Sequence, residues 1–279
     1  MKIAIHGLGY VGLITGLCFA ENEDNTIIGC EVDSQKVEML KQGKPYIYEK
    51  GLQDLLNDAL KRGNFIPTTD FSKTSEATID LIAVGTPSNS DGSANLKYVE
   101  AVAKNIGKNI KNYKVIATKS TVPAGTHLTI EKLIKKEIEK RNKNIEFDVA
   151  SIPEFLKEGT AIEDFSKPDR IVIGTNSFKA KMLLEKLFKP YVLNGHPLIH
   201  MNPLESEIVK YASNGMLALK IAFTEELAQL ADQLSSHLGV EVDVLNVLKG
   251  MCTDSRIGNQ FFKPDQVMVA VVFLKTLKP

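Results

Sequence analysis

The chain has 279 residues, which is enough for one large or two ordinary domains with a sizeable core. Basic and acidic residues both number 34, so the formal net charge is zero, and no basic excess favours nucleic acid or a membrane surface as a partner. Because the sequence goes straight into a strand pattern and contains no apolar run of 18 or more residues, we expect neither a signal peptide nor a transmembrane helix. The three cysteines and five histidines lack CxxC or metal-ligand spacing, so we expect a cytoplasmic protein without disulfides or bound metal.

A glycine-rich turn opens the chain. A short apolar run, residues 2–5, leads into the sequence GLGYVG and then into an apolar helical pattern. In a dinucleotide-binding turn the first glycine makes the strand-to-helix turn, the second lets a pyrophosphate approach the backbone, and the third lets the helix pack closely on the strand. The helix N-terminus supplies N–H groups and a positive dipole to the phosphates. The predicted cofactor-binding residues here are Gly7, Gly9, Tyr10, Val11 and Gly12.

An acidic residue follows the second strand pattern, residues 26–30. Glu31 stands about twenty residues beyond the turn, where an acid accepts hydrogen bonds from the adenosine ribose hydroxyls of NAD. Its charge repels the extra phosphate of NADP, so the sequence predicts NAD as cofactor. The alternative is an ordinary strand–helix–strand unit in which the glycines serve packing alone.

Strand and helix patterns alternate over the first two hundred residues, which predicts an α/β fold with a Rossmann-like, doubly wound parallel sheet. The expected helices span 34–41 (with Ser34 as N-cap), 51–62, 95–108 and 177–188. The expected later strands span 78–84, 114–118, 147–150 and 170–174, and the last of them is expected to complete the sheet. Cys18 and Cys30 fall in the first helix and second strand, where we expect them to be buried.

The pattern changes after residue 200. Residues 203–238 contain no internal proline, and their apolar positions recur at helical spacing, which predicts one long helix that serves as a domain spine or a dimer seam. Two helices kinked at Gly215 are the alternative.

Polar groups follow three of the predicted strands, at the edge where doubly wound sheets bind ligands. They are Thr86 directly after Gly85, then Thr121, and then Glu154 with Glu158. Glu154 and Glu158 are four residues apart, so on a helical turn they would share a face and could hold a water and move protons. The alternative is a solvated acidic helix start.

A second pair of polar residues lies on the long helix. Lys210 and Asn214 are also four apart, and an ammonium beside an amide suits a developing oxyanion. Surface residues without a catalytic role are the alternative.

Seven longer segments resemble one protein family. In chain order they read GLGYVG, EVDSQKVEMLKQGKPYIYEKGL, VGTPSNSDGSANLKYV, TKSTVPAGT, SIPEFLKEGTAIEDFSKPDRIVIG, ESEIVKYASNGMLALKIAF and DSRIG. They resemble the UDP-glucose/GDP-mannose dehydrogenase family, and within it the UDP-glucose 6-dehydrogenases. That family oxidises the C6 alcohol of a nucleotide sugar to a carboxylate in two NAD-dependent steps without releasing the aldehyde. The resemblance implies that the substrate of this protein would be UDP-glucose and its product UDP-glucuronate, a precursor for polysaccharide synthesis.

The resemblance also implies residue roles. Thr121 and Glu158 would order the water that hydrolyses a thioester, Glu154 would lie near the reacting carbon, and Lys210 and Asn214 would stabilise the tetrahedral oxyanion and contact the sugar. Outside the glycine turn, the implied NAD site comprises Glu31, Lys36, Gly85, Thr86, Thr121 and Glu158. The implied sugar-nucleotide site adds Phe155, Leu156, Lys157 and Arg256. The long helix would be a homodimerisation helix, across which Arg256 often acts in this family.

The implied domains are an NAD-binding domain over 1–200, a central helical region over 201–264 and an aberrant tail over 265–279. The family's cysteine motif and second nucleotide-binding domain are missing, and Cys252 is a poor substitute nucleophile. Inserting one base lets permitted codons for the tail spell GSGYGGSCFPKDTKA, with the cysteine at Val272. We therefore interpret the tail as a frameshift product and expect no turnover. A genuine hydrophobic C-terminal strand is the alternative.

Three other functions compete with this interpretation. GDP-mannose or another UDP-sugar could be the substrate, because the base would be recognised largely by the missing half. A non-catalytic, dimeric NAD-binding fragment is a second possibility. A hydroxyacid dehydrogenase with the same domain plan leaves EFLKEG and KYASNG unexplained.

Overall fold

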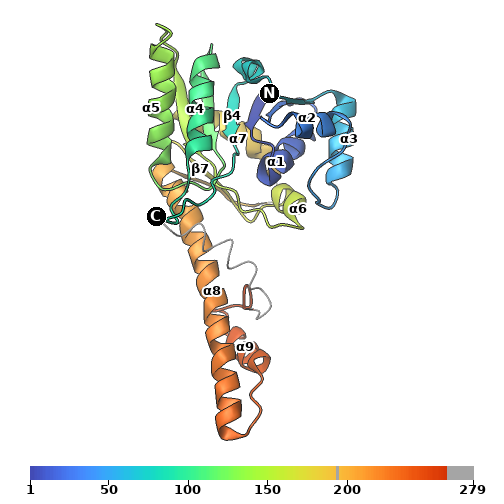
Figure 1. Ribbon diagram of the computed structural model, residues 1–279, viewed down its shortest axis with the longest axis vertical. Helices are drawn as coiled ribbons and strands as arrows, with labels where there is room; N and C mark the ends of the chain where they lie inside the picture. The colour runs from blue at the N-terminus through green and yellow to red at the C-terminus, as the bar shows by residue number, and fades with distance from the viewer. Residues whose placement is uncertain (193–194, 263–279) are drawn as a thin grey trace. The chain divides into compact units, whose positions relative to one another are not determined.

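A computed structural model describes residues 1–192 and 195–262 (Figure 1). The chain divides into two compact units, the first formed by residues 1–87 and 94–210 and the second by residues 88–93 and the chain from Tyr211 onwards. The tail expected from residue 265, including Val272, lies outside the described residues.

One eight-stranded sheet forms the centre of the first unit, in the order β3-β2-β1-β4-β5-β6-β7-β8. Neighbouring strands are parallel except β6 and β7, which pair in antiparallel fashion at Ser151 and Gly174. The strands are β1 Lys2–His6, β2 Thr26–Cys30, β3 Phe65–Thr68, β4 Ile79–Ile82, β5 Lys114–Thr118, β6 Phe147–Ser151, β7 Ile171–Gly174 and β8 Leu198–Met201. The predicted doubly wound sheet is confirmed as mostly parallel.

Helices cover both faces of this sheet (Figure 1). Alternate strand residues explain this arrangement, since Ile79 and Leu81 join the core cluster under α1, α3, α6 and α7, whereas Ile82 joins the cluster under α4 and α5. The α-helices are α1 Tyr10–Ala20, α2 Ser34–Lys41, α3 Leu52–Arg62, α4 Lys97–Asn109, α5 Thr126–Glu139, α6 Ala161–Ser166, α7 Phe178–Phe188, α8 Pro203–Leu238 and α9 Val244–Cys252. Two short 3₁₀ helices, η1 Phe71–Glu76 and η2 Lys189–Tyr191, complete the described elements.

Two details differ from the expectations. The strand ending at Gly174 does not complete the sheet, because β8 pairs with β7 in parallel. β8 has only four residues, LIHM, and none of them is fully buried. The N-cap of α2 is Asp33 rather than Ser34. The Asp33 carboxylate reaches the backbone N–H groups of Gln35 and Lys36 at 2.9 and 3.3 Å.

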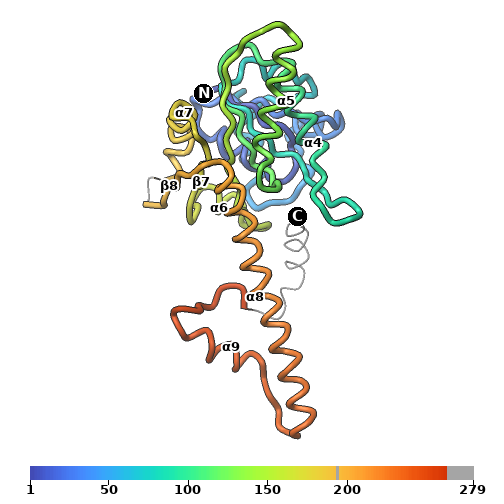
Figure 2. Tube along the Cα trace, turned by 90° about the vertical axis from the view of Figure 1, so that its left-hand side faces the viewer, coloured from blue at the N-terminus to red at the C-terminus, as the bar shows by residue number. Residues whose placement is uncertain are grey.

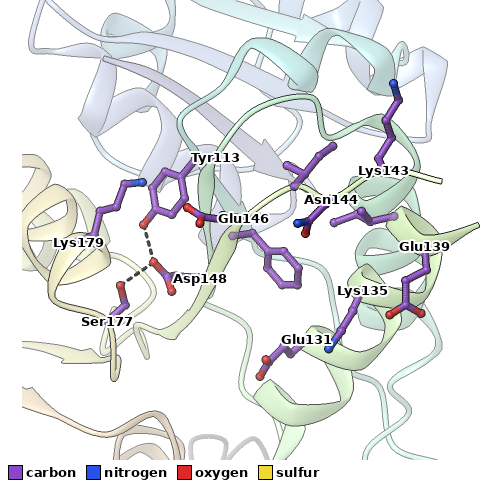
Figure 3. Close-up of a pocket in the computed structure, with 13 residues that line it drawn as sticks. Tyr113, Glu131, Lys135, Glu139, Lys143, Asn144, Glu146, Asp148, Ser177 and Lys179 are labelled. Atoms are coloured by element: carbon purple, nitrogen blue, oxygen red, sulfur yellow. Dashed lines mark hydrogen bonds between the residues drawn. The ribbon is translucent and has the colours of Figure 1, made fainter. Parts of the chain in front are cut away.

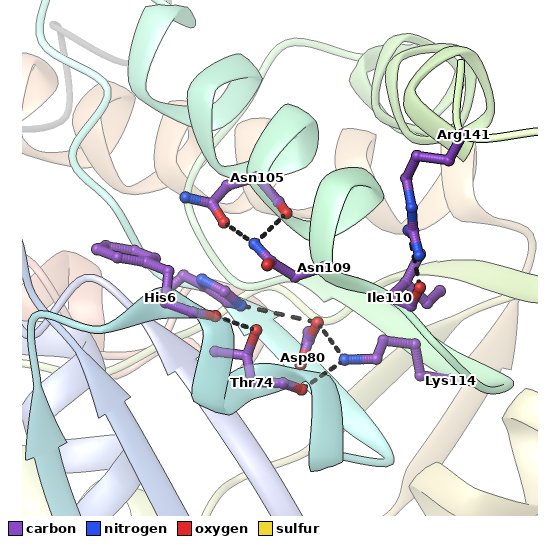
Figure 4. A network of polar contacts seen from close by, with 9 residues as sticks. His6, Thr74, Asp80, Asn105, Asn109, Ile110, Lys114 and Arg141 are labelled. Atoms are coloured by element: carbon purple, nitrogen blue, oxygen red, sulfur yellow. Dashed lines mark hydrogen bonds and ion pairs between the residues drawn. The ribbon is translucent and has the colours of Figure 1, made fainter. Parts of the chain in front are cut away.

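A buried polar network lies within the sheet on the face covered by η1 and α4 (Figure 4). Nζ of Lys114 lies 3.0 Å from Oδ2 of Asp80 and donates to the carbonyl of Thr74 at 2.8 Å. Nε2 of His6 lies 3.7 Å from the same carboxylate oxygen. All three charged or ionisable side chains are almost completely buried. The network therefore joins β1, β4 and β5 through buried side chains.

The second unit contains most of α8 together with α9. Helix α8 begins in the first unit, and its residues from Tyr211 onwards belong to the second. Figure 2 shows α8 as one continuous helix, so the prediction of a long helix unbroken at Gly215 is confirmed. No helix in the described part of the chain is both long and apolar enough to cross a bilayer.

Candidate active site

Packing and backbone geometry account for two glycines of the turn. Gly7 has a φ of +92°, and a Cβ there would lie 2.8 Å from Cγ1 of Val84. A Cβ on Gly12 would lie 1.9 Å from the carbonyl oxygen of Gly7. Helix α1 can therefore approach the end of β1 only without side chains at these positions.

Packing does not account for Gly9 or Gly85. A Cβ on either would meet no described atom within 4 Å, and Gly9 has an ordinary φ of −59°. Among the described residues no side chain caps α1, and its first turn holds no acid. The N–H groups of that turn and the open space at Gly9 fit the diphosphate of a dinucleotide.

Glu31 lies beside this turn. Its Oε2 accepts from the Leu8 N–H at 3.0 Å, and its Oε1 accepts from the N–H groups of Val32 and Asp33 at 2.9 and 3.3 Å. These bonds use three of the roughly four acceptor positions of a carboxylate. Among the described contacts, Oε2 therefore keeps one acceptor position, which could take a hydrogen bond from one ribose hydroxyl.

Lys36 and Tyr46 border the same turn. Tyr46 donates its hydroxyl hydrogen to the Leu8 carbonyl, and Nζ of Lys36 lies 5.2 Å from the centroid of the Tyr46 ring. Burial, together with the negative charges of Glu31 and Asp33, raises the pKa of Tyr46. Tyr46 was not among the predicted site residues, although it lies within a segment that carries the family resemblance.

The ends of β4 and β5 meet through Thr86 and Thr121. Oγ1 of Thr86 donates to the Thr121 carbonyl at 2.8 Å, and Oγ of Ser120 donates to the Val84 carbonyl at 2.7 Å. The structure therefore brings these two predicted site residues together.

Glu154 and Lys210 form the central ion pair of the site. Nζ of Lys210 donates to the carbonyl and to Oε1 of Glu154 at 2.6 and 3.0 Å, and the Leu156 N–H donates to Oε2 at 2.7 Å. Lys210 is only 8% exposed. The ring of Phe155 lies 3.8 Å from the Arg170 guanidinium and 5.3 Å from Nζ of Lys210, measured to the ring centroid. The pair is thus fixed by at least three directional contacts and an aromatic neighbour.

The expectation that Glu154 and Glu158 share a helical face is wrong. Residues 152–157 have no regular structure, a turn follows at 158–160, and α6 begins only at Ala161. Gly159, directly after Glu158, has a φ of +91°, so a helical backbone does not continue from Glu158 into α6. Glu154 is held by Lys210, whereas Glu158 is exposed.

Three other predicted site residues, Lys157, Arg256 and Asn214, are not part of the Glu154–Lys210 contacts. Lys157 pairs with Asp164 at 3.1 Å, and Arg256, whose side chain is 88% exposed, pairs with Asp254 at 2.6 Å in the second unit. The hydrogen bond to Arg256 lowers the pKa of Asp254. Asn214, which follows Lys210 by about one turn of α8, belongs to the second unit and is 5% exposed.

Lys119 is a site residue that was not predicted. It follows β5, is 5% exposed, and its Nζ lies 5.7 Å from the centroid of the Phe165 ring. Burial lowers the pKa of Lys119 to about 8; the charge of Glu154 opposes this shift, and that of Lys210 adds to it. The signal in the sequence was a lysine directly after the strand pattern KVIAT, whose three central residues are apolar.

The cysteines of the described chain do not supply an activated thiolate. Cys18 and Cys30 are completely buried, as predicted, and burial raises the pKa of both, that of Cys30 to about 12. Cys252 is partly exposed at the end of α9. No group of three or more potential metal ligands occurs among the residues that the structure describes.

A pocket of about 420 Å³ lies at the opposite edge of the sheet (Figure 3). Asp148 accepts hydrogen bonds from the hydroxyls of Tyr113 and Ser177, both at 2.6 Å, and Nζ of Lys179 lies 3.3 Å from the centroid of the Tyr113 ring. The pocket borders the amino ends of β5 and β6, whereas Thr121 and Glu154 follow their carboxyl ends. It is therefore separate from the candidate active site.

Comparison with known proteins gives concordant matches. Residues 1–192 match the UDP-glucose/GDP-mannose dehydrogenase family, NAD binding domain, and residues 204–269 match the central domain of that family. UDP-glucose 6-dehydrogenase TuaD of Bacillus subtilis is 41% identical over 263 residues, covering 94% of this chain and 54% of the relative. A UDP-glucose 6-dehydrogenase of Rhizobium meliloti is 41% identical over 268 residues, which cover 94% of this chain and 58% of the relative.

Solved structures agree with these matches. A UDP-glucose dehydrogenase from Pyrobaculum islandicum superposes with a TM-score of 0.85 at 35% identity, covering 99% of this chain and 66% of that one. A GDP-mannose dehydrogenase from Pseudomonas aeruginosa, solved as a ternary complex, superposes with a TM-score of 0.84 at 30% sequence identity. The match covers 99% of this chain and 65% of that one. The chain spans little more than half the length of these two curated relatives. It belongs to the UDP-glucose/GDP-mannose dehydrogenase family, and its first 192 residues are the NAD-binding domain of that family.

Proposed function

We propose that this chain carries the NAD site and part of the catalytic apparatus of a UDP-glucose 6-dehydrogenase, which oxidises UDP-glucose to UDP-glucuronate for polysaccharide synthesis. The observation that carries the proposal is the largely buried Glu154–Lys210 pair at the edge of the sheet where the glycine turn leads into α1, a helix start with no side-chain cap among the described residues. The activity is that of the longer relatives, since the chain spans little more than half of their length.

Among the described contacts, Lys210 has one ammonium hydrogen left for substrate. Two of its three ammonium hydrogens bond to Glu154, and the third can donate to the C6 oxygen as negative charge develops there. Asn214, about one helical turn later, is proposed to donate to the same oxygen. A bound NAD would supply the acceptor for the hydride that leaves C6.

Thr121 and Glu158 are proposed to order the hydrolytic water. The exposed Glu158 carboxylate can accept a proton from that water, and the Thr121 carbonyl is already engaged by Thr86, which fixes its backbone. Phe155, Leu156 and Lys157 are proposed to line the sugar-nucleotide site, with Arg256 reaching the sugar or its carboxylate.

The 279-residue chain is proposed to bind NAD without completing turnover. Two of its three cysteines are buried with raised pKa values, and Cys252 lies outside the cysteine motif that the family resemblance leads us to expect. The test is calorimetric titration of the purified chain with NAD and NADP, followed by an assay for UDP-glucuronate. We expect NAD binding, at least tenfold weaker NADP binding because of Glu31, and no product. Absence of NAD binding would overturn the proposal, and sustained UDP-glucuronate production would refute the predicted inactivity.

GDP-mannose or another UDP-sugar is the second candidate substrate. The similarity to a GDP-mannose dehydrogenase structure, with a TM-score of 0.84, supports it. A protein in which the reading frame after codon 264 is restored should turn over UDP-glucose faster than GDP-mannose; the reverse order favours the second candidate. The third candidate, a non-catalytic NAD-binding fragment that dimerises through the long helix, predicts cofactor binding without turnover and a dimer in sedimentation.

We also propose a homodimer through α8, in the cytoplasm, where the free cysteines fit a reducing environment. Apolar side chains remain exposed along α8 at roughly helical spacing, which is typical of an unpartnered interface. They are Met216, Leu219, Phe223, Leu230, Leu234 and Leu238. Sedimentation velocity should give a dimer that Leu230→Lys dissociates, and a monomeric parent chain would contradict this.

A further inference from the structure

Glu49 is a buried carboxylate that joins three distant segments of the first unit. It is 5% exposed, and its Oε2 accepts from the Tyr10 hydroxyl and, at 2.9 Å, from the Gly159 N–H. Its Oε1 accepts from the Ala161 N–H at 3.0 Å. The Gly159 N–H also lies 3.3 Å from the Tyr10 hydroxyl oxygen, which closes the network.

The local chain geometry holds Glu49 in this position. Gly51 has a φ of +85° and caps α3, whose first residue, Leu52, is almost completely buried in the core. The backbone next to Glu49 is therefore anchored, and the side chain has little freedom to move away. A buried carboxylate is costly unless hydrogen-bonded, and here three donors offset that cost.

The partners of Glu49 lie next to the two halves of the candidate active site. Tyr10 follows Gly9 of the glycine turn, and Gly159 follows Glu158. Burial, the Glu49 hydrogen bond and the charges of Glu49 and Glu158 raise the pKa of Tyr10, so its hydroxyl stays protonated and donates to Glu49.

The loop that carries the candidate catalytic glutamates is thus fixed at both ends. Lys210 holds it at Glu154, and Glu49 holds it at Gly159 and Ala161. The second attachment runs directly to the first residue of α1, at the turn that fits the diphosphate.

We propose that Glu49 is a positioning residue that couples occupancy of the glycine turn to the order of the Glu154–Glu158 loop. The coupling rests on the proposed function, because it presumes that NAD occupies the turn. The positioning itself does not, since the Glu49 contacts exist within the chain alone.

The test is hydrogen exchange of the full chain, with and without NAD, in wild type and Glu49→Gln. Gln keeps the size of the side chain but cannot accept from all three donors. Without NAD, the variant should exchange the Gly159 and Ala161 amides roughly tenfold faster or more, while amides of α7 are unchanged. With NAD, these two amides should gain protection in the wild type, and the variant should bind NAD yet lose that gain.

Two further variants separate positioning from stability. Tyr10→Phe deletes only the hydroxyl and should weaken the coupling in part. Tyr191→Phe deletes a different hydroxyl that bonds to α1, at the Cys18 carbonyl 2.9 Å away, and should leave the coupling intact. If Tyr10→Phe and Tyr191→Phe lose the NAD-dependent protection to the same extent, the role is merely structural and the proposal is overturned.

The remaining outcomes are distinguishable. Unchanged exchange at Gly159 and Ala161 in Glu49→Gln overturns the positioning role, whether or not NAD binds. Failure of the wild type to bind NAD overturns the coupling and the proposed function, whereas faster exchange in the variant would still support positioning. If Glu49→Gln does not fold, Tyr10→Phe carries the same comparison.

Discussion

Glu207 of α8 holds His127 of α5 through both its backbone and its ring. The carboxylate accepts from the His127 N–H at 2.8 Å and lies 2.9 Å from Nδ1 of the ring, and it also accepts from the Gly125 N–H at 2.6 Å. It therefore caps the first turn of α5 from another element, and it does so one turn before Lys210 on α8. The segment carrying Thr121 and the helix carrying Lys210 are fixed to each other at this point.

Replacing Glu207 by Gln should destabilise the first unit by about 1–3 kcal/mol. The residue is 2% exposed, and an amide can satisfy fewer of the three donors that face it. Urea unfolding at pH 7 provides the measurement. Glu205→Gln is the matched control. Glu205 lies on the same helix as Glu207 and accepts an exposed hydrogen bond from the N–H of Asn202, the residue before the helix, so its replacement should cost less than about 1 kcal/mol. Equal losses in the two variants would contradict the prediction.

Gly12→Ala and Gly9→Ala should separate folding from cofactor binding. The added methyl at Gly12 would overlap the Gly7 carbonyl at 1.9 Å, so we expect a loss of roughly 3 kcal/mol or more, seen as a lower thermal midpoint. The methyl at Gly9 meets no described atom within 4 Å, so the midpoint should change little while NAD affinity falls at least tenfold. Unchanged NAD affinity in Gly9→Ala would contradict the assignment of the turn.

The sequence predicted the glycine turn, several strands and the long helix well, because steric and apolar patterns within a short stretch of chain determine these elements. The glycine turn, the strands near Leu81 and Val115, and the long α8 follow from steric and apolar periodicity within short windows. The position of the α2 cap was wrong by one residue, since Asp33 and Ser34 are both good caps and only their backbone angles distinguish them.

Contacts between distant residues could not be predicted in this way. Glu154 turns toward Lys210 rather than toward Glu158 because a buried ammonium attracts it, and that partner lies far along the chain. Glu49 was not singled out for the same reason, as its donors come from Tyr10 and Gly159. The family resemblance marked these segments but not their partners.

Lys114→Met should destabilise the first unit by about 3–5 kcal/mol, because it leaves the completely buried Asp80 carboxylate without its ammonium partner. Within the described residues Oδ1 of Asp80 already has no hydrogen-bond partner, and Nε2 of His6 lies 3.7 Å from Oδ2, beyond hydrogen-bond distance. Urea unfolding at pH 7 measures the loss. Lys2→Met, which removes an exposed pair with Glu76, should cost less than about 1 kcal/mol. If Lys114→Met also lowers the free energy of unfolding by less than about 1 kcal/mol, the buried pair contributes no more than a surface pair.

Lys119→Met should stabilise the protein near neutral pH, with a gain that disappears in alkali. Burial lowers the pKa of Lys119 from 10.5 to about 8, so between these values the unfolded chain binds more protons than the folded chain. Stability conferred by this residue therefore rises with pH, and the cost of burying the ammonium, about 3 kcal/mol, applies fully below pH 8 and vanishes above 10.5. Urea unfolding of both proteins at pH 7, 9 and 10.5 measures the difference, in which the titration of all other groups cancels. Lys97→Met is the control, because it makes the same exchange at an exposed lysine over the Tyr98 ring. A difference between Lys119→Met and wild type that stays constant across this range would mean that Lys119 is solvated rather than buried beside Glu154.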